Sequence, residues 1–304
     1  MRYGIIDIGT NSMRLLLAQY NDGVFEYREK IIDTTRLGEG VDSEGMISKE
    51  SISRNIDSLQ KLKKIAVDYG CDGIHCIGTA ALRNARNGLD FVELAKKDTG
   101  LDVEIISGDR EALLGYLGVI GGLNSIEDYF LVIDIGGGSI EFIVGNSEEI
   151  LFKESVDIGA LKLTEKFITS IPETDETIRE LRKYINIEIR NVISKILSLG
   201  IPMKLIGIGG TITSVSAINQ KLENYSMEKI HLSEVTIDDI KSQVQEIRTM
   251  TSDDRENIKG LQRKRSKIIL AGEYILIEIM DLLQKNKIIV SEYDNLEGYI
   301  LFSR

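Results

Sequence analysis

The sequence predicts an α/β fold made of two related lobes, each a mixed sheet with helices on its faces. Apolar runs of strand length alternate along the chain with longer amphipathic segments, the pattern of sheets covered by helices. The segment IDIGTNSMRLLLA (6–18) returns as IDIGGGSIEFIVG (133–145), identical at five of 13 positions. Each copy is typical of a strand, a tight turn and a second strand, so each half of the chain contributes one hairpin. Chance similarity between two short apolar segments is the alternative.

Strands and helices alternate between the two copies. We expect strands at 24–33, 72–79 and 102–107, and helices at 48–70, 88–100 and 110–122. Ser48 and Gly70 are the residue types that begin and end a helix, which supports the first of these helices.

The second half repeats this arrangement. We expect strands at 129–135, 203–209 and 287–291, and helices at about 175–199, after Thr211, at 236–250 and at 266–284. A Pro-rich or Ser-rich linker is absent from the sequence, so we place the boundary between the lobes near residues 121–124. The predicted lobes are therefore 1–122 and 123–292, with 293–304 as a candidate segment that packs back onto the first lobe.

Composition narrows the function. The chain has 304 residues, with 37 Lys+Arg against 48 Asp+Glu, a net charge of −11. This balance argues against a general binder of nucleic acid or membrane surfaces, because both need exposed cations. Since neither a signal peptide nor a long uninterrupted apolar stretch is evident, we expect a cytoplasmic protein. Two Cys and two His leave little material for disulfides, a His-rich zinc site or a Ser-His-Asp triad.

Three turns have the composition of phosphate-binding loops. DIGTNS (7–12) and DIGGGS (134–139) each place a carboxylate at a strand end before small residues, whose N–H groups can cradle an anion while the Asp holds a divalent cation. GIGGT (207–211) would add donors at a helix N-terminus. Plain hairpins with conformationally free Gly are the alternative. The candidate phosphate-binding residues here are Asp7, Gly9, Thr10, Asn11, Ser12, Gly136, Gly137, Gly138, Ser139, Gly209, Gly210 and Thr211.

Single charged residues complete the candidate site. Glu111 lies in the first turn of the helix that follows the 102–107 strand, where it is either a general base or a favourable charge at a helix N-terminus. Arg14 occupies the repeat position that Glu141 holds in the second copy, which suits one lobe binding phosphate and the other a metal, although a solvated Arg is the alternative. The cationic run 263–267 is a polyanion contact or a solvated surface.

Together these motifs resemble the Ppx/GppA phosphatase family, the exopolyphosphatases and guanosine pentaphosphate phosphohydrolases of the actin, sugar kinase and heat-shock ATPase superfamily. The matching segments are collinear over nearly the whole chain: IDIGTNSMRLLL, RLGEGVDSEGMIS, GTAALRNARN, VEIISGDREALLGYLGV, LVIDIGGGSIEFIVG, DIGALKLTE, IGIGGTITSV and GLQRKRSKIILAG. The resemblance implies two actin-like (ribonuclease H-like) lobes with the active site in the cleft between them.

The resemblance also implies roles for individual residues. Glu111 matches the catalytic base that activates water. Asp134 and Glu141 match the acidic residues around the metal, which we expect to be Mg²⁺ or another divalent cation. The basic residues that match those holding substrate phosphates are Arg14, Arg83 and Arg265.

Four positions depart from the pattern of the family. Ile140 stands where Thr is usual, and Arg110 stands where Glu often precedes the catalytic residue. Leu232 follows His231 where Gly is common, and Leu296 in SEYDNLEG stands where the family has Arg. The last two positions bear on contacts with the rest of the substrate more than on the hydrolytic centre.

We therefore predict a metal-dependent hydrolase that removes terminal phosphate from inorganic polyphosphate, guanosine pentaphosphate, or both. The predicted ligands are polyphosphate and guanosine penta- or tetraphosphate, with no nucleic-acid or membrane partner and a homodimer as the candidate assembly. Two alternatives stay open. A kinase or ATPase of the superfamily would need an adenosine pocket at GIGGT, and a sensor of guanosine alarmones would bind without releasing phosphate. The sequence leaves substrate preference and processivity open.

Overall fold

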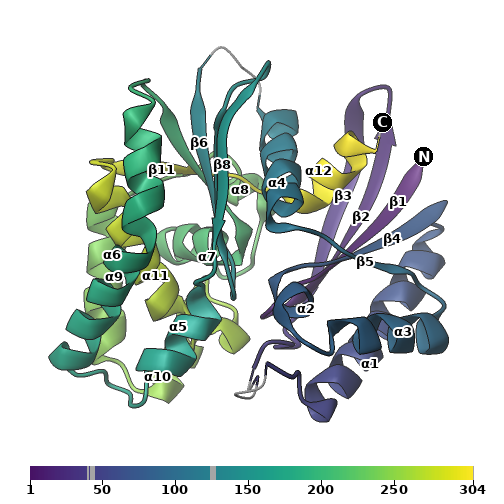
Figure 1. The fold of residues 1–304 in the computed structure, drawn as a ribbon, viewed down its shortest axis with the longest axis horizontal. Helices are drawn as coiled ribbons and strands as arrows, with labels where there is room; N and C mark the ends of the chain where they lie inside the picture. The colour runs from purple at the N-terminus through teal and green to yellow at the C-terminus, as the bar shows by residue number, and fades with distance from the viewer. Residues whose placement is uncertain (40, 42–44, 124–127, 304) are drawn as a thin grey trace.

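Two sheets stand side by side, each covered by helices (Figure 1). The computed structural model describes residues 1–39, 41, 45–123 and 128–303. Part of the expected boundary at 121–124, and part of the segment RLGEGVDSEGMIS, lie outside the described residues. Among the described residues, no helix is both long and apolar enough to cross a membrane.

The first sheet has the order β3-β2-β1-β4-β5. Its strands are β1 (Arg2–Ile8), β2 (Met13–Asn21), β3 (Val24–Asp33), β4 (Gly73–Gly78) and β5 (Val103–Ile105). The face that carries Ile6 and Leu15 packs against α1 (Lys49–Tyr69) and α3 (Gly88–Thr99). Ser48 and Gly70 cap α1 as predicted: the Ser48 side chain accepts a hydrogen bond from the Ser51 N–H, and Gly70 adopts the left-handed conformation. The short α2 (Ala80–Asn84) follows β4.

The second sheet has the order β10-β11-β9-β6-β7-β8. Its strands are β6 (Phe130–Ile135), β7 (Ile140–Gly145), β8 (Ile150–Val156), β9 (Lys204–Ile208), β10 (Glu234–Thr236) and β11 (Lys287–Val290). One face joins the largest apolar core, to which helices contribute from across the second half of the chain. These helices are α5 (Ala160–Phe167), α6 (Asp175–Ser198), α7 (Gly209–Asn219), α8 (Met227–Ile230), α9 (Ile237–Thr249) and α11 (Ile269–Leu282).

Two helices cross between the sheets. α4 (Gly108–Gly122) packs Tyr116 and Val119 against the remaining face of the second sheet. The C-terminal α12 (Asn295–Phe302) packs Leu296 and Ile300 against the first sheet and lies beside α4 (Figure 1). The two helix backbones approach so closely that a Cβ at Gly298 would overlap the Leu114 carbonyl. The predicted lobes are thus joined by two helices: α4 precedes the second sheet in the chain and packs on it, and α12 follows that sheet but packs on the first.

The longer predicted elements are present, with ends shifted by a few residues. The predicted strand 102–107 is shorter, and the helix after it begins at Gly108, where Ser107 accepts a hydrogen bond from the Arg110 N–H. Several short elements were not predicted, including α8, β10, α10 (Ser252–Glu256) and the 3-10 turn Arg263–Arg265. They span too few residues for an apolar period to develop.

One buried carboxylate in the second lobe lacks a hydrogen-bond partner. Glu273 on α11 is 0% exposed, and neither carboxylate oxygen has a partner among the described residues. The nearby Arg255 guanidinium is already engaged by Glu173 through two 2.7 Å hydrogen bonds. Burial raises the pKa of Glu273 well above its usual value, and Arg255 only partly opposes this. Glu273 therefore favours the protonated state when the chain is folded.

We predict that Glu273→Gln makes folding less sensitive to pH. An acid with a raised pKa in the folded state stabilises the fold at low pH, and this contribution is lost as pH rises from the unfolded pKa through the folded one. The variant should therefore unfold at a higher temperature than wild type at about pH 8, with little difference at about pH 4. Glu278→Gln is the matched control, because Glu278 is buried on the same helix but paired with Arg182. If the unfolding temperatures of wild type and Glu273→Gln changed with pH by the same amount, the prediction would be contradicted.

Candidate functional site

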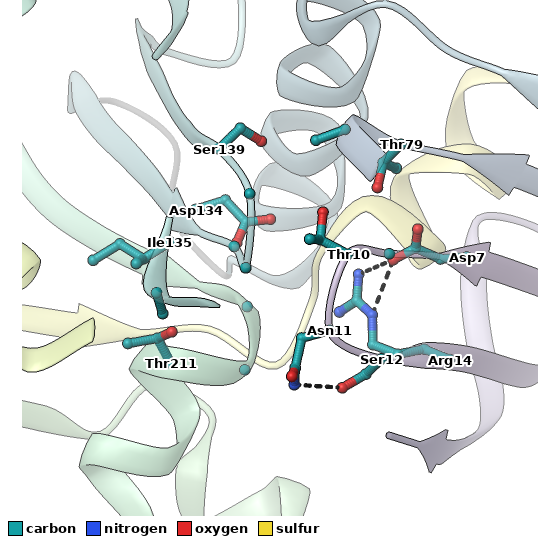
Figure 2. Close-up of a pocket in the computed structure, with 18 of the residues that line it drawn as sticks. Asp7, Thr10, Asn11, Ser12, Arg14, Thr79, Asp134, Ile135, Ser139 and Thr211 are labelled. Carbon is teal, nitrogen blue, oxygen red and sulfur yellow. Dashed lines mark hydrogen bonds and ion pairs between the residues drawn. The ribbon is translucent and has the colours of Figure 1, made fainter. Parts of the chain in front are cut away.

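The three predicted phosphate-type turns meet at one cavity of about 70 Å³. A single water needs ~10–15 Å³ by this measure, so the cavity has room for several waters. Figure 2 shows Asp7 and Asp134 on opposite walls with Thr10 between them. The predicted residues that line it are Asp7, Gly9, Thr10, Asn11, Ser12, Arg14, Glu111, Asp134, Gly136, Gly137, Gly138, Ser139, Gly209, Gly210, Thr211 and Arg265. The lining residues that were not predicted are Thr79, Ala80, Ile135, Ala160, Ile268 and Asn295.

The two hairpin turns have the same local geometry, which confirms the internal repeat. The Gly9 N–H donates to the Ser12 carbonyl at 3.1 Å, and the Gly136 N–H donates to the Ser139 carbonyl at 3.0 Å. Asp7 pairs with Arg14 across the first hairpin, as Asp134 does with Glu141 across the second. A Cβ at Gly138 would lie 2.7 Å from Thr10 Oγ1, so glycine lets the two turns touch and close the cavity between them.

Arg14 is held by carboxylates from both ends of the chain. Its Nε donates to Asp7 Oδ2 at 3.0 Å, and its Nη1 donates to Asp294 Oδ2 at 2.9 Å. Burial opposes the Arg14 charge, but Asp294 and Asp7 overcome it and raise the pKa of Arg14. Asp7 Oδ1 is buried without a partner among the described residues. Arg14 thus holds Asp7 in place through Oδ2 and leaves Asp7 Oδ1 without a partner among the described residues. The role of Arg14 as a phosphate ligand stays a prediction.

Glu111 has the position and the proton affinity of a base. It lines the cavity from the first turn of α4 and is 9% exposed. Burial raises the pKa of Glu111 to about 7, against the opposing effect of Arg83. A carboxylate that titrates near neutrality can accept a proton and lose it again during turnover.

Arg83 lies behind Glu111 rather than in the cavity wall. Its Nη1 donates to Glu111 Oε2 at 2.9 Å and to the Ile106 carbonyl at 3.0 Å, and it is absent from the lining residues. The sequence placed Arg83 on substrate phosphate. In this structure the Arg83 guanidinium orients the Glu111 carboxylate at the junction of α2 and α4, and its role on substrate phosphate stays a prediction.

The two predicted metal ligands lie in different surroundings. Asp134 faces the cavity, and burial raises its pKa to about 6, opposed by Arg14. Glu141 is 2% exposed, accepts a 2.9 Å hydrogen bond from Ser155 Oγ and does not line the cavity. Burial, together with the negative charge of Glu111, raises the pKa of Glu141 well above its usual value. Glu141 thus lies outside the cavity wall, and its role at the metal stays a prediction.

The uncommitted donors fit a hard divalent cation. The charged groups that line the cavity are Asp7, Asp134 and Glu111 against Arg14 and Arg265, a net charge of 2 − 3 = −1 when all are ionised. Among the described residues, no three His, Cys, Asp or Glu side chains form a metal-binding group. Mg²⁺ does not need such a cage, because it keeps several waters and binds one or two carboxylates plus substrate oxygens. Asp134 and the unpartnered Asp7 Oδ1 would fit that requirement.

Arg265 is a buried cation without an anion. Its side chain lines the cavity, is 8% exposed and makes no ion pair within the described part of the chain. Burial, with the like charge of Arg14, lowers the pKa of Arg265 to about 10. An anionic ligand would relieve both effects, so Arg265 is well placed for an anion, and its role as a phosphate ligand stays a prediction.

The four departures lie away from the cavity wall. Ile140 is buried in the core, and Arg110 pairs with Glu104 on the surface. Leu232 adopts a φ of 62°, the left-handed region that explains why glycine is common there. Leu296 is buried against the first sheet. None of these side chains lines the catalytic cavity.

The chain is similar to known proteins over nearly its whole length. A model of the Ppx/GppA phosphatase family matches residues 16–303. A bifunctional 3-dehydroquinate synthase/phosphatase of Fusobacterium nucleatum is 36% identical over 97% of this chain, although the chain spans only 46% of that protein. Exopolyphosphatase 2 of Mycobacterium tuberculosis is 30% identical over 99% of this chain and 98% of its own length.

A solved structure agrees over the full length. The crystal structure of an exopolyphosphatase from Cytophaga hutchinsonii is 29% identical and superposes with a TM-score of 0.90, covering 100% of this chain and 97% of that one. The predicted class of two actin-like lobes is therefore confirmed.

We predict that Arg83→Gln raises the pKa of Glu111 above its value of about 7, since a nearby cation favours the ionised carboxylate. Carboxyl NMR titration of the ligand-free protein would measure the shift. Arg110→Gln is the matched control, because Arg110 is next to Glu111 on α4 but pairs with the exposed Glu104. If Glu111 titrated identically in wild type and Arg83→Gln, the positioning role of Arg83 would be wrong.

Proposed function

The chain belongs to the Ppx/GppA phosphatase family and is a phosphoanhydride hydrolase, and we propose that it removes the terminal phosphate of inorganic polyphosphate. The observation that carries the proposal is Glu111, a buried carboxylate that titrates near neutrality and faces a cavity closed by three phosphate-type turns. The exopolyphosphatase names of its relatives support polyphosphate as the substrate. Guanosine pentaphosphate is a second candidate, supported by the family alone.

In the proposed reaction, the terminal phosphoryl group lies between the turns after β1 and β6. The backbone N–H groups of these turns and the Arg265 guanidinium donate to its oxygens. Glu111 accepts a proton from a water as the water oxygen forms a bond to phosphorus. The bond between phosphorus and the bridging oxygen breaks, and the shortened chain leaves as an anion with the bridging oxygen.

The acidic residues have a separate task. Asp134 and Asp7 Oδ1 would hold Mg²⁺, which when bound offsets negative charge on the phosphoryl oxygens. Arg14 orients Asp7 by donating to its Oδ2, while Glu141 and Ser155 support the second hairpin from behind. The net charge of −11 supports our further proposal that the protein acts without a nucleic-acid or membrane partner. A cytoplasmic location also stays a proposal. A homodimer stays a proposal.

The alternatives receive less support. A kinase or ATPase would need a nucleoside pocket at the start of α7, but the Arg265 guanidinium packs against Gly210 there. A sensor that binds guanosine alarmones without hydrolysis would have no use for a base such as Glu111 in the cavity.

The test is phosphate release from polyphosphate, guanosine pentaphosphate, ATP and GTP, measured side by side with Mg²⁺. We expect release from polyphosphate, and we expect Glu111→Gln to lower kcat by ~10²–10⁴ because general-base catalysis is lost. The control is Glu104→Gln, which makes the same change on the exposed part of β5. A Glu111→Gln enzyme with wild-type kcat would show that another group accepts the proton.

A further inference from the structure

A second, smaller cavity adjoins the catalytic one. Both are bounded by Arg14, Gly209, Gly210 and Arg265. The remaining polar residues of its wall are Lys30, Thr213, Ser214, Tyr225, Gln262, Glu292 and Asp294. Its volume of about 30 Å³ has room for two or three waters at ~10–15 Å³ each, which is the space of one phosphoryl group rather than of a nucleoside.

Arg265 lies on the partition between the two cavities. Its guanidinium borders both, and it neither donates a hydrogen bond to nor pairs with any side chain of the described ranges. The other cation on the partition, Arg14, is satisfied by Asp7 and Asp294. An anion on either side can therefore bind Arg265 without displacing an existing partner, and two linked phosphoryl groups can bind it from both sides.

The charges of the second cavity favour an anion. Arg14, Lys30 and Arg265 stand against Glu292 and Asp294, a net charge of 3 − 2 = +1 when all are ionised. The Glu292 carboxylate accepts a hydrogen bond from the Tyr225 hydroxyl, and burial raises the pKa of Glu292, which favours its neutral form. Since Arg14 and Lys30 already pair with carboxylates, the charge of this wall that is left for a ligand is that of Arg265.

Besides Arg265, Gln262 provides a hydrogen-bond donor to this pocket that has no partner among the described residues. Lys30 is occupied by Asp294, Glu297 and the Glu292 carbonyl. The Thr213 hydroxyl donates to the Gly209 carbonyl at 3.2 Å. The side-chain amide of Gln262 donates to no residue that the structure describes, and it sits three residues before Arg265 on the turn that carries both.

We propose that this second cavity binds the phosphoryl group next to the terminal one, with Gln262 and Arg265 as the donors to its oxygens. The proposal rests on the proposed function and deepens it. The group attached to the terminal phosphate must then be small and anionic, so the site selects a phosphoanhydride chain over a phosphomonoester. Gln262 becomes a specificity-determining residue that never touches the reacting phosphorus.

The experiment compares tripolyphosphate with orthophosphate in wild type and Gln262→Leu. We expect the KM and the calorimetric Kd for tripolyphosphate to rise roughly tenfold or more, because a hydrogen bond to a charged group is lost. The inhibition constant of orthophosphate, which fills only the catalytic cavity, should change far less, and kcat should fall less than KM rises. Gln262→Lys, which restores a donor, should recover tripolyphosphate affinity. Gln60→Leu on the exposed face of α1 is the matched control.

The outcomes separate the two proposals. Hydrolysis with an unchanged KM in Gln262→Leu overturns the second subsite and leaves the proposed function standing. Tripolyphosphate binding that depends on Gln262 without any phosphate release overturns the proposed function and keeps the subsite. If Gln262→Leu weakened the binding of orthophosphate and of tripolyphosphate equally, the subsite would also be overturned, because Gln262 would then be acting on the catalytic cavity.

Discussion

The site depends on the burial of three carboxylates in one small cavity, where loss of hydration, and to a lesser degree mutual repulsion, disfavours their ionised forms. Asp7, Asp134 and Glu111 line the same space, and burial raises the pKa of both Asp134 and Glu111. Their cationic neighbours differ: Arg14 donates to Asp7, and Arg83 partly offsets the desolvation of Glu111. One carboxylate is therefore free to accept a proton while two others can hold a cation.

The packing of α4 on the second sheet and of α12 on the first makes this arrangement possible. α4 packs on the second sheet and carries Glu111 at its N-terminus, while α12 packs on the first sheet and brings Asp294 to Arg14. Close backbone contact at Gly298 joins the two helices. The proton acceptor and the support for Asp7 thus lie at the junction of the lobes, where a change in their relative position would alter both.

Features that depend on residues close together in the sequence could be predicted. The repeated hairpins predicted the two turns and the equivalence of Arg14 with Glu141, because pairing register is determined by alternation within each hairpin. The partners that define each role could not be predicted, because they come from distant parts of the chain: Arg14 and Asp294 lie 280 residues apart. The contact of Arg83 with Glu111 could not be predicted for the same reason, since only packing brings the two side chains together.

The most direct test of this unfavourable ionisation of buried carboxylates is thermal unfolding of the ligand-free protein with and without Mg²⁺. We predict that Mg²⁺ raises Tm at about pH 8 and has little effect at about pH 5, where the raised pKa of Asp134 favours its neutral form. Asp134→Asn should raise Tm without the metal and abolish most of the response. An equal Mg²⁺ response in wild type and Asp134→Asn, or a variant less stable than wild type at about pH 8, would contradict the account.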